Sequence, residues 1–218
     1  MDILQGNFEQ RMHAAISFAW AIFSKKVGSG IIGINKEASM QLHYAYILNQ
    51  VMPLAVLEQN EFYHVELETG VKVESKAKEI DLLLAGIKDD VEYKIAVEMK
   101  CYRSITAAGK NRGATDIFMK DVYYDLSLLE KYCEEGWANK GIALVMNDRN
   151  AFVKPKKKNK KCWDYDISQS TIAGPETLTT QVGSKKTAVN IILKQQYNFN
   201  WQQCGNFWFC ELEGHDPA

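Results

Sequence analysis

The chain has 218 residues and a formal net charge of −1, with 46% hydrophobic and 24% charged residues. These proportions are typical of a globular protein with one sizeable core, and they argue against intrinsic disorder. The small net charge gives the whole molecule no attraction for nucleic acid, so any nucleic-acid surface has to be a local patch.

The cysteines and the hydropathy pattern indicate a cellular compartment. The chain has five cysteines and no CxxC pair, which argues against a disulfide framework or a zinc site and favours reduced thiols. The first apolar stretch is preceded by Glu9, Arg11 and His13, which is not typical of a signal peptide. The sequence contains no run of about 18 apolar residues, so no membrane span is predicted. We therefore expect a cytoplasmic protein that does not enter a membrane.

Two helices are predicted in the N-terminal part of the chain. Apolar residues recur at helical spacing over residues 7–26. Three glycines then interrupt the pattern, and a second helix is expected to start near Asn35, a good N-cap, and to end at Pro53. Glu37 stands in the first turn of this helix, where the helix dipole favours a carboxylate.

The next stretch changes to the period of β-strands. Residues 62–67 predict a strand, with a turn at Gly70. Residues 79–87 and 92–100 predict two buried strands, and the residues between them, 88–90, are typical of a turn. The two strands are therefore expected to pair as a hairpin.

The second half of the chain predicts a crossover. Residues 101–114 are expected to form a basic loop, followed by a long helix that Thr115 caps and that ends near Glu135. Residues 141–146 then predict a short apolar strand, and residues 187–212 two more strands. A helix followed by a strand in this order favours an α/β fold, with a mixed β-sheet flanked by helices.

The predicted hairpin carries an unusual set of polar residues. Side chains alternate along a strand, so Glu98 and Lys100 share the face opposite the apolar one, roughly 7 Å apart along the strand. The hairpin would bring Asp81 near Glu98. Two carboxylates can hold magnesium, which polarises a phosphate and acidifies a bound water, and a neighbouring lysine can orient that water or stabilise developing charge. The alternative is a solvated Glu98–Lys100 pair at the strand edge, with Asp81 capping a turn.

These residues resemble the PD-(D/E)XK nucleases, a superfamily that includes many restriction endonucleases. The resemblance lies in Asp81 and Glu98-Met99-Lys100 on adjacent strands, after a helix that carries Glu37 and before a long helix and an apolar strand. It covers roughly residues 35–146. The residue before Asp81 is Ile80 rather than proline, a small departure because the chemistry needs the carboxylate.

The resemblance implies a restriction endonuclease-like core and a magnesium-dependent endonuclease acting on DNA, with manganese expected to substitute. Asp81 and Glu98 would hold the metal, with the Met99 carbonyl as a third ligand, and Lys100 would act on the water or the transition state. An acidic residue of the preceding helix joins the site in many family members, which implies a role for Glu37. The alternative for Glu37 is that it only complements the helix dipole.

Basic segments are candidates for contacts with double-stranded DNA. Arg103, Lys110 and Arg112 follow the hairpin on the predicted loop, where phosphate contacts would suit them. Residues 154–161, KPKKKNKK, could follow a DNA backbone. Within this run we select three lysines as candidates: Lys156, Lys157 and Lys158. For both segments the alternative is a solvated loop.

Two further features have alternative interpretations. Polar residues on the third helix could reach the site, although a solvated face is the favoured interpretation; they are Lys120, Asp121, Tyr124 and Asp125. The aromatic residues of the tail could stack on bases, but packing in a core is the better explanation for most of them.

We expect a single nuclease domain over residues 1–218, with the core motifs in 35–146 and a basic loop and C-terminal strands in 147–218. By analogy within the family, a small chain of this kind is most similar to a type II restriction or other defence enzyme. A two-fold DNA target would favour a homodimer. The alternatives are a repair, recombination or phage-type nuclease with little sequence preference, and a non-catalytic nucleic-acid-binding module.

Overall fold

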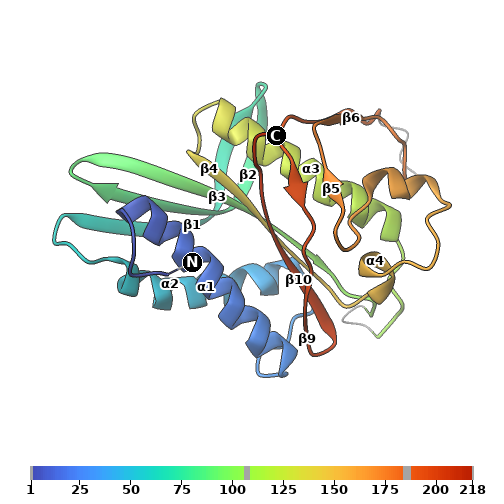
Figure 1. Ribbon diagram of the computed structural model, residues 1–218, viewed down its shortest axis with the longest axis horizontal. Helices are drawn as coiled ribbons and strands as arrows, with labels where there is room; N and C mark the ends of the chain where they lie inside the picture. The colour runs from blue at the N-terminus through green and yellow to red at the C-terminus, as the bar shows by residue number, and fades with distance from the viewer. Residues whose placement is uncertain (1, 106–108, 184–187, 218) are drawn as a thin grey trace.

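The computed structural model describes residues 2–105, 109–183 and 188–217. Within these ranges the chain folds as a mixed α/β protein with four α-helices and a six-stranded sheet (Figure 1). In chain order the elements are α1 (Phe8–Gly28), α2 (Glu37–Ala55), β1 (Glu61–Val73), β2 (Lys76–Lys88), β3 (Val91–Tyr102), α3 (Thr115–Glu134), β4 (Lys140–Asn147), α4 (Asn150–Val153), a 3-10 helix (Lys161–Tyr165), β5 (Ile172–Ala173), β6 (Glu176–Leu178), β7 (Ile191–Leu193), β8 (Tyr197–Asn198), β9 (Gln202–Cys204) and β10 (Phe207–Glu213).

The main sheet has the strand order β1-β2-β3-β4-β10-β9. Strands β3 and β4 are parallel, whereas the other neighbouring pairs are antiparallel. The parallel pair is joined through α3, so the predicted crossover and the mixed sheet are confirmed. Two small two-stranded sheets, β5–β8 and β6–β7, complete the fold.

Both N-terminal helices are confirmed, but the boundaries predicted for α2 are wrong. Lys36, not Asn35, is its N-cap, because the Asn35 side chain instead accepts a hydrogen bond from Ser39 at 3.1 Å. Pro53 does not end the helix, which continues to Ala55. Ala55 is fully buried and its carbonyl accepts a hydrogen bond from Arg11 at 2.9 Å, so packing against α1 extends the helix beyond the proline.

The two hairpins differ in how well local sequence predicted their turns. Between β2 and β3, Asp89 and Asp90 have φ of 51° and 61°, the backbone of a tight two-residue turn, as predicted. The turn predicted at Gly70 is wrong, because Gly70 pairs with Glu79 inside β1. The buried valines of residues 71–73 continue the strand past it.

α3 has the predicted length, although its cap was misassigned. Ala114, with φ of 58°, is the N-cap, and Thr115 is already helical. The left-handed residue turns the chain into the helix without a side-chain cap. The helix ends at Glu134, before Gly136 with φ of 77°, close to the predicted end.

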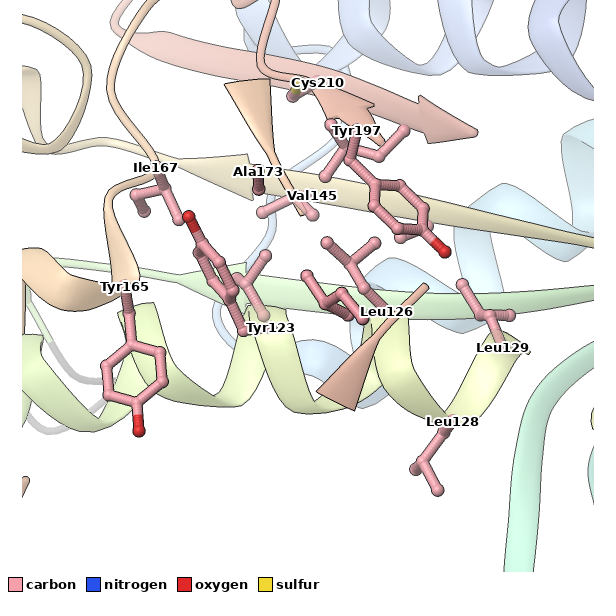
Figure 2. Close-up of a cluster of buried hydrophobic side chains, with 14 of the residues drawn as sticks. Tyr123, Leu126, Leu128, Leu129, Val145, Tyr165, Ile167, Ala173, Tyr197 and Cys210 are labelled. Carbon is pink, nitrogen blue, oxygen red and sulfur yellow. The ribbon is translucent and has the colours of Figure 1, made fainter. Parts of the chain in front are cut away.

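The predicted alternation along β3 is confirmed by the two hydrophobic cores. Ile95, Val97 and Met99 pack towards α1 and α2 on one face of the sheet, whereas Ala96 belongs to the core that contains α3 on the other. Figure 1 shows the helices on the two faces, and Figure 2 shows the α3 core. In that core Tyr123, Leu126 and Leu129 from α3 meet Val145, Tyr165, Tyr197 and Cys210.

The C-terminal tail forms four short strands, β7 to β10, instead of the predicted two. Polar residues such as those at 194–196 interrupt the apolar pattern, so pairing is divided between the main sheet and the two small sheets. Most of the tail aromatics are buried, including Tyr197, Phe199 and Trp201, so the core-packing interpretation is confirmed for them.

Parts of two predicted segments lie outside the described residues. Residues 106–108 of the predicted basic loop and residue 187 of the predicted tail lie outside them. Within the described ranges, no helix combines the length and the apolar character needed to cross a membrane.

Candidate active site

The candidate site lies where strands β2 and β3 separate. Their pairing begins at the turn and its last pair is Leu82 with Val97, so Asp81 and Glu98 are the first residues beyond it. Beyond the split, within the described residues, β2 remains paired with β1 and β3 remains paired with β4, but β2 and β3 no longer pair with each other. The backbone N–H of Met99 donates instead to the Asp81 carboxylate, at 2.7 Å. The side chain of Asp81 therefore replaces a strand partner and is fixed at the split.

α2 supplies a second support for Asp81. The amide of Gln41, which is buried, donates to the other oxygen of the Asp81 carboxylate at 2.6 Å. Glu37 lies one helical turn earlier, so both side chains project from one face of the helix. The Glu37 carboxylate accepts the backbone N–H of Cys101 at 3.2 Å. The first turn of α2 is thereby attached to β3 beside the site.

Lys100 lies between carboxylates from two helices. Its Nζ is 3.0 Å from Asp125 of α3 and 3.4 Å from Glu37 of α2. Burial lowers the pKa of Lys100, but Asp125 and Glu37 outweigh this effect and raise the pKa above its usual value. The ammonium therefore stays protonated at neutral pH. It can donate hydrogen bonds and offset negative charge.

Glu98 is buried on the face of the sheet that α3 covers. The hydroxyl of Tyr132, itself fully buried, donates to its carboxylate at 3.0 Å. Burial, followed by the nearby Asp125 and Asp81 carboxylates, raises the pKa of Glu98 well above its usual value. Asp81 and Glu98 are close enough for a hydrogen bond between their carboxyl groups. Ionisation of the Glu98 carboxyl group therefore destabilises the folded protein unless a cation offsets the charge.

Asp81, which is partly buried, and Asp125, which is buried, share this excess of negative charge. Burial is the largest cause that raises the pKa of Asp81, and likewise that of Asp125, which the neighbouring ammonium only partly offsets. Asp125 Oδ2 makes its ion pair with Lys100 but has no hydrogen bond of ordinary geometry within the described residues. Four carboxylates thus surround one ammonium; the four are Glu37, Asp81, Glu98 and Asp125.

This donor set fits a magnesium ion. The described residues contain no cluster of three or more His, Cys, Asp or Glu side chains already arranged as a metal site. Magnesium, however, is commonly bound through one or two carboxylates and keeps several waters, so a larger protein cage is not needed. Asp81 and Glu98 supply two adjacent hard oxygen donors, and their unfavourable ionisation is what a divalent cation would relieve.

α3 contributes two residues whose roles the sequence analysis did not assign. For Asp125 the favoured interpretation, a solvated face, is wrong, because its side chain is 9% exposed and contacts Lys100. The sequence patterns indicate no role in the site for Tyr132. The signal was present: Asp125 and Tyr132 are two helical turns apart, within the buried arc of the helix. The other polar residues predicted on this helix have partners elsewhere: Lys120 pairs with Asp121, and Tyr124 accepts a hydrogen bond from Lys78.

The predicted DNA-contact residues lie near the ends of β3 and α4. Arg103 pairs with Asp148 at 3.0 Å. Arg112 and Lys110 are exposed on the loop before α3. Lys156 and Lys157 are exposed as well. In contrast, Lys158 donates to Asp166 at 2.5 Å and to Ser168 at 2.9 Å, so it also anchors the loop that carries the lysine run.

No protein-family model, curated protein or solved structure matches the chain. Support for a function therefore comes from the arrangement and chemistry of the site itself.

Proposed function

We propose that this chain is a magnesium-dependent endonuclease of the PD-(D/E)XK type that hydrolyses phosphodiester bonds in double-stranded DNA. The observation that carries the proposal is the split between β2 and β3. There Asp81 and Glu98 meet, with Lys100 two residues further along the same face and Glu37 beside it. A restriction endonuclease-like core is the finer description of the fold that this arrangement supports.

In this proposal each side chain has a distinct part. Asp81 and Glu98 would hold the metal, with the carbonyl of Met99 as a third ligand. The bound metal supplies the charge that polarises the phosphate and acidifies a water. Lys100, which stays protonated, donates to the attacking water or to a phosphate oxygen and stabilises the charge of the transition state.

The surrounding residues orient these groups. Gln41 and the N–H of Met99 fix Asp81, and Tyr132 fixes Glu98. Glu37 and Asp125 hold the ammonium of Lys100 from either side. Groups that are held in this way lose little entropy when the reaction begins, which is the basis of preorganised catalysis.

The test is cleavage of plasmid and mixed linear DNA with magnesium, with and without excess chelator. We expect cleavage with magnesium or manganese, none with chelator, and a loss of about 100-fold or more for Glu98→Ala and for Lys100→Ala. Glu92→Ala and Lys94→Ala are matched controls, because these residues form an ion pair at 2.7 Å near the start of the same strand. Undiminished cleavage in chelator, or normal cleavage by Lys100→Ala, contradicts the mechanism.

Sequencing the cut ends separates the narrower possibilities. One recurrent sequence supports a type II restriction or other defence nuclease, whereas scattered ends support a repair, recombination or phage-type enzyme. DNA binding by both the parent and Glu98→Ala, with no cleavage by the parent in any divalent metal, supports a non-catalytic module instead. A homodimer is the expected assembly if the recognised sequence is two-fold symmetric.

A further inference from the structure

Two segments of the chain concentrate positive charge. Residues 101–114 and 149–161 together contain ten lysines and arginines and no aspartate or glutamate. The first segment begins at the C-terminal end of β3 and the second follows the C-terminal end of β4. Because Tyr102 pairs with Asn147 at the ends of these parallel strands, both segments start at the same end of the sheet (Figure 1).

Aromatic rings join the two segments. The rings of Tyr102 and Phe152 are 5.0 Å apart between centroids, and both are buried. The guanidinium of Arg112 lies over Tyr102 at 5.6 Å, and that of Arg149 lies over Phe152 at 5.8 Å. Two arginines from distant parts of the chain thus stack on one pair of buried aromatic rings.

The same arrangement continues onto β10. Arg103 lies over Phe207 at 4.9 Å, and Lys154 lies over the adjacent Trp208 at 5.0 Å. A cation that stacks on a ring is ordered without giving up its charge, and its N–H groups remain available to a phosphate. We call the set formed by Arg103, Arg112, Arg149 and Lys154 the cationic end surface.

Few carboxylates neutralise the cationic end surface. Among its four members, Arg103 is the one with an ion-pair partner within the described residues, Asp148. Arg112, Arg149 and Lys154 are exposed to solvent, as are Lys156 and Lys157 a short way along the chain. In a molecule with a net charge of −1, such a local excess of exposed cations is suited to a polyanion.

The cationic end surface adjoins the candidate active site. Arg103 is three residues beyond Lys100 in the chain. The Glu37 carboxylate accepts the backbone N–H of Cys101 at 3.2 Å, and the guanidinium of Arg112 lies over the ring of the next residue, Tyr102, so the acidic site and the arginines meet on the same stretch of β3. The cationic end surface therefore lies next to the part of β3 that carries Lys100.

We propose that the cationic end surface docks the phosphate backbone of double-stranded DNA beside the active site. The choice of DNA duplex rests on the proposed function, whereas the recognition of a polyphosphate backbone rests on the stacked cations. Since phosphate contacts carry no sequence information, this surface fixes where the duplex lies, and base recognition is left to other residues.

The test is equilibrium binding of a labelled DNA duplex in chelator, so that binding is measured without cleavage. The double variant Arg112→Gln with Arg149→Gln should bind about 10-fold more weakly at roughly 0.1 M salt. Its slope of log affinity against log salt should fall by about 2, close to the 0.9 expected for each lost phosphate contact. The matched control is Lys131→Gln with Lys194→Gln, which removes equal charge from lysines paired with Glu74 and Glu134. This control should keep both values.

Melting of each variant is measured in parallel, because the two arginines contact buried rings. If the double variant does not fold, Lys154→Gln replaces it, since this side chain is exposed, and the expected fall in the slope is then about 1. An unchanged salt slope, or an equal loss in the control, overturns the assignment of the surface. Tighter binding of RNA or single strands through the same residues overturns the assignment of duplex DNA.

The outcomes also separate this inference from the proposed function. A protein that binds duplex through the cationic end surface but cuts no DNA refutes the nuclease and keeps the surface. A protein whose double variant cuts with unchanged KM refutes the surface and keeps the nuclease.

Discussion

Lys100 is the residue whose chemistry the structure defines most closely. Carboxylates from α2 and α3 hold its ammonium and raise its pKa, which favours a protonated lysine that donates hydrogen bonds. The sequence placed Lys100 beside Glu98 by strand alternation alone. It left open whether the lysine orients the attacking water or stabilises developing charge, and it did not predict the ion pair with Asp125, which is 25 residues further along the chain.

Asp125 is expected to be a positioning residue that acts through Lys100. Asp125→Asn keeps the size of the side chain but removes the nearer of the two charges that hold the ammonium, at 3.0 Å. We expect kcat to fall about 10- to 100-fold with little change in KM, the usual effect of removing a group that orients an active-site residue. The measurement is steady-state cleavage of DNA.

A double-mutant cycle checks that interpretation of Asp125. In a Lys100→Ala background, Asp125→Asn should cost little more, because the group it positions is already absent. Asp121→Asn, one turn earlier in α3 and paired with Lys120 at 2.9 Å, is the matched control and should cut normally. Full additivity of the two losses would show that Asp125 acts independently of the lysine.

At the scale of single elements, α2 and α3 each deliver a pair of polar side chains to the split between β2 and β3. α2 brings Glu37 and Gln41, one turn apart, and α3 brings Asp125 and Tyr132, two turns apart. Helical periodicity predicted both helices. It also places Asp125 and Tyr132 in the buried arc of α3, but it does not predict their partners, because an isolated polar side chain in an apolar arc carries no information about what it contacts on the sheet.

Glu37 is the member of α2 that distinguishes a role in the site from a role in the helix. Glu37→Gln keeps the size and most hydrogen bonding but removes the charge 3.4 Å from Lys100. A role in the site predicts slower cutting and a weaker apparent magnesium affinity, with little change in melting. A helix-dipole role alone predicts normal cutting and a loss of stability of up to about 1 kcal/mol. Magnesium titrations of the cleavage rate decide between them, and superimposable curves would remove Glu37 from the site.

At the scale of the whole molecule, local signals predicted the fold well and long-range pairing limited the rest. The hairpin of β2 and β3 and the crossover to β4 follow from contiguous patterns, and the strand register that brings Asp81 to Glu98 follows from the turn at Asp89 and Asp90. The return of β10 to pair with β4 joins residues more than 60 apart, and no local pattern encodes it. The contact between Tyr132 and Glu98 spans 34 residues of the chain and likewise has no local signal.

The acidic site should also control how stability depends on pH. The folded-state pKa values of Asp81, Glu98 and Asp125 are raised, chiefly by burial, above ordinary values of 3.8 to 4.5. A carboxyl group whose pKa is raised by folding binds more protons in the folded state than in the unfolded state. The metal-free protein should therefore lose stability as pH rises above about 4 towards the folded-state pKa values. Glu61 and Glu213 have pKa values lowered to about 2, so their contribution to stability is lost only as pH falls below about 4.

Glu98→Gln tests this linkage with a readout that needs no cleavage. At pH 8 the variant should melt several degrees above the metal-free parent, because one pH unit of pKa displacement is about 1.4 kcal/mol and each kcal/mol shifts Tm by roughly 2–4 °C at this size. Near pH 4 the gain should vanish, since Glu98 is then neutral in both states. Magnesium should raise the Tm of the parent at pH 8 and leave the variant nearly unchanged, because only a folded site with both acids binds it well. Glu92→Gln, an exposed change on the same strand, should behave like the parent. An equal difference in stability between Glu98→Gln and the parent at pH 4 and at pH 8 would mean that ionisation of Glu98 does not destabilise the folded protein.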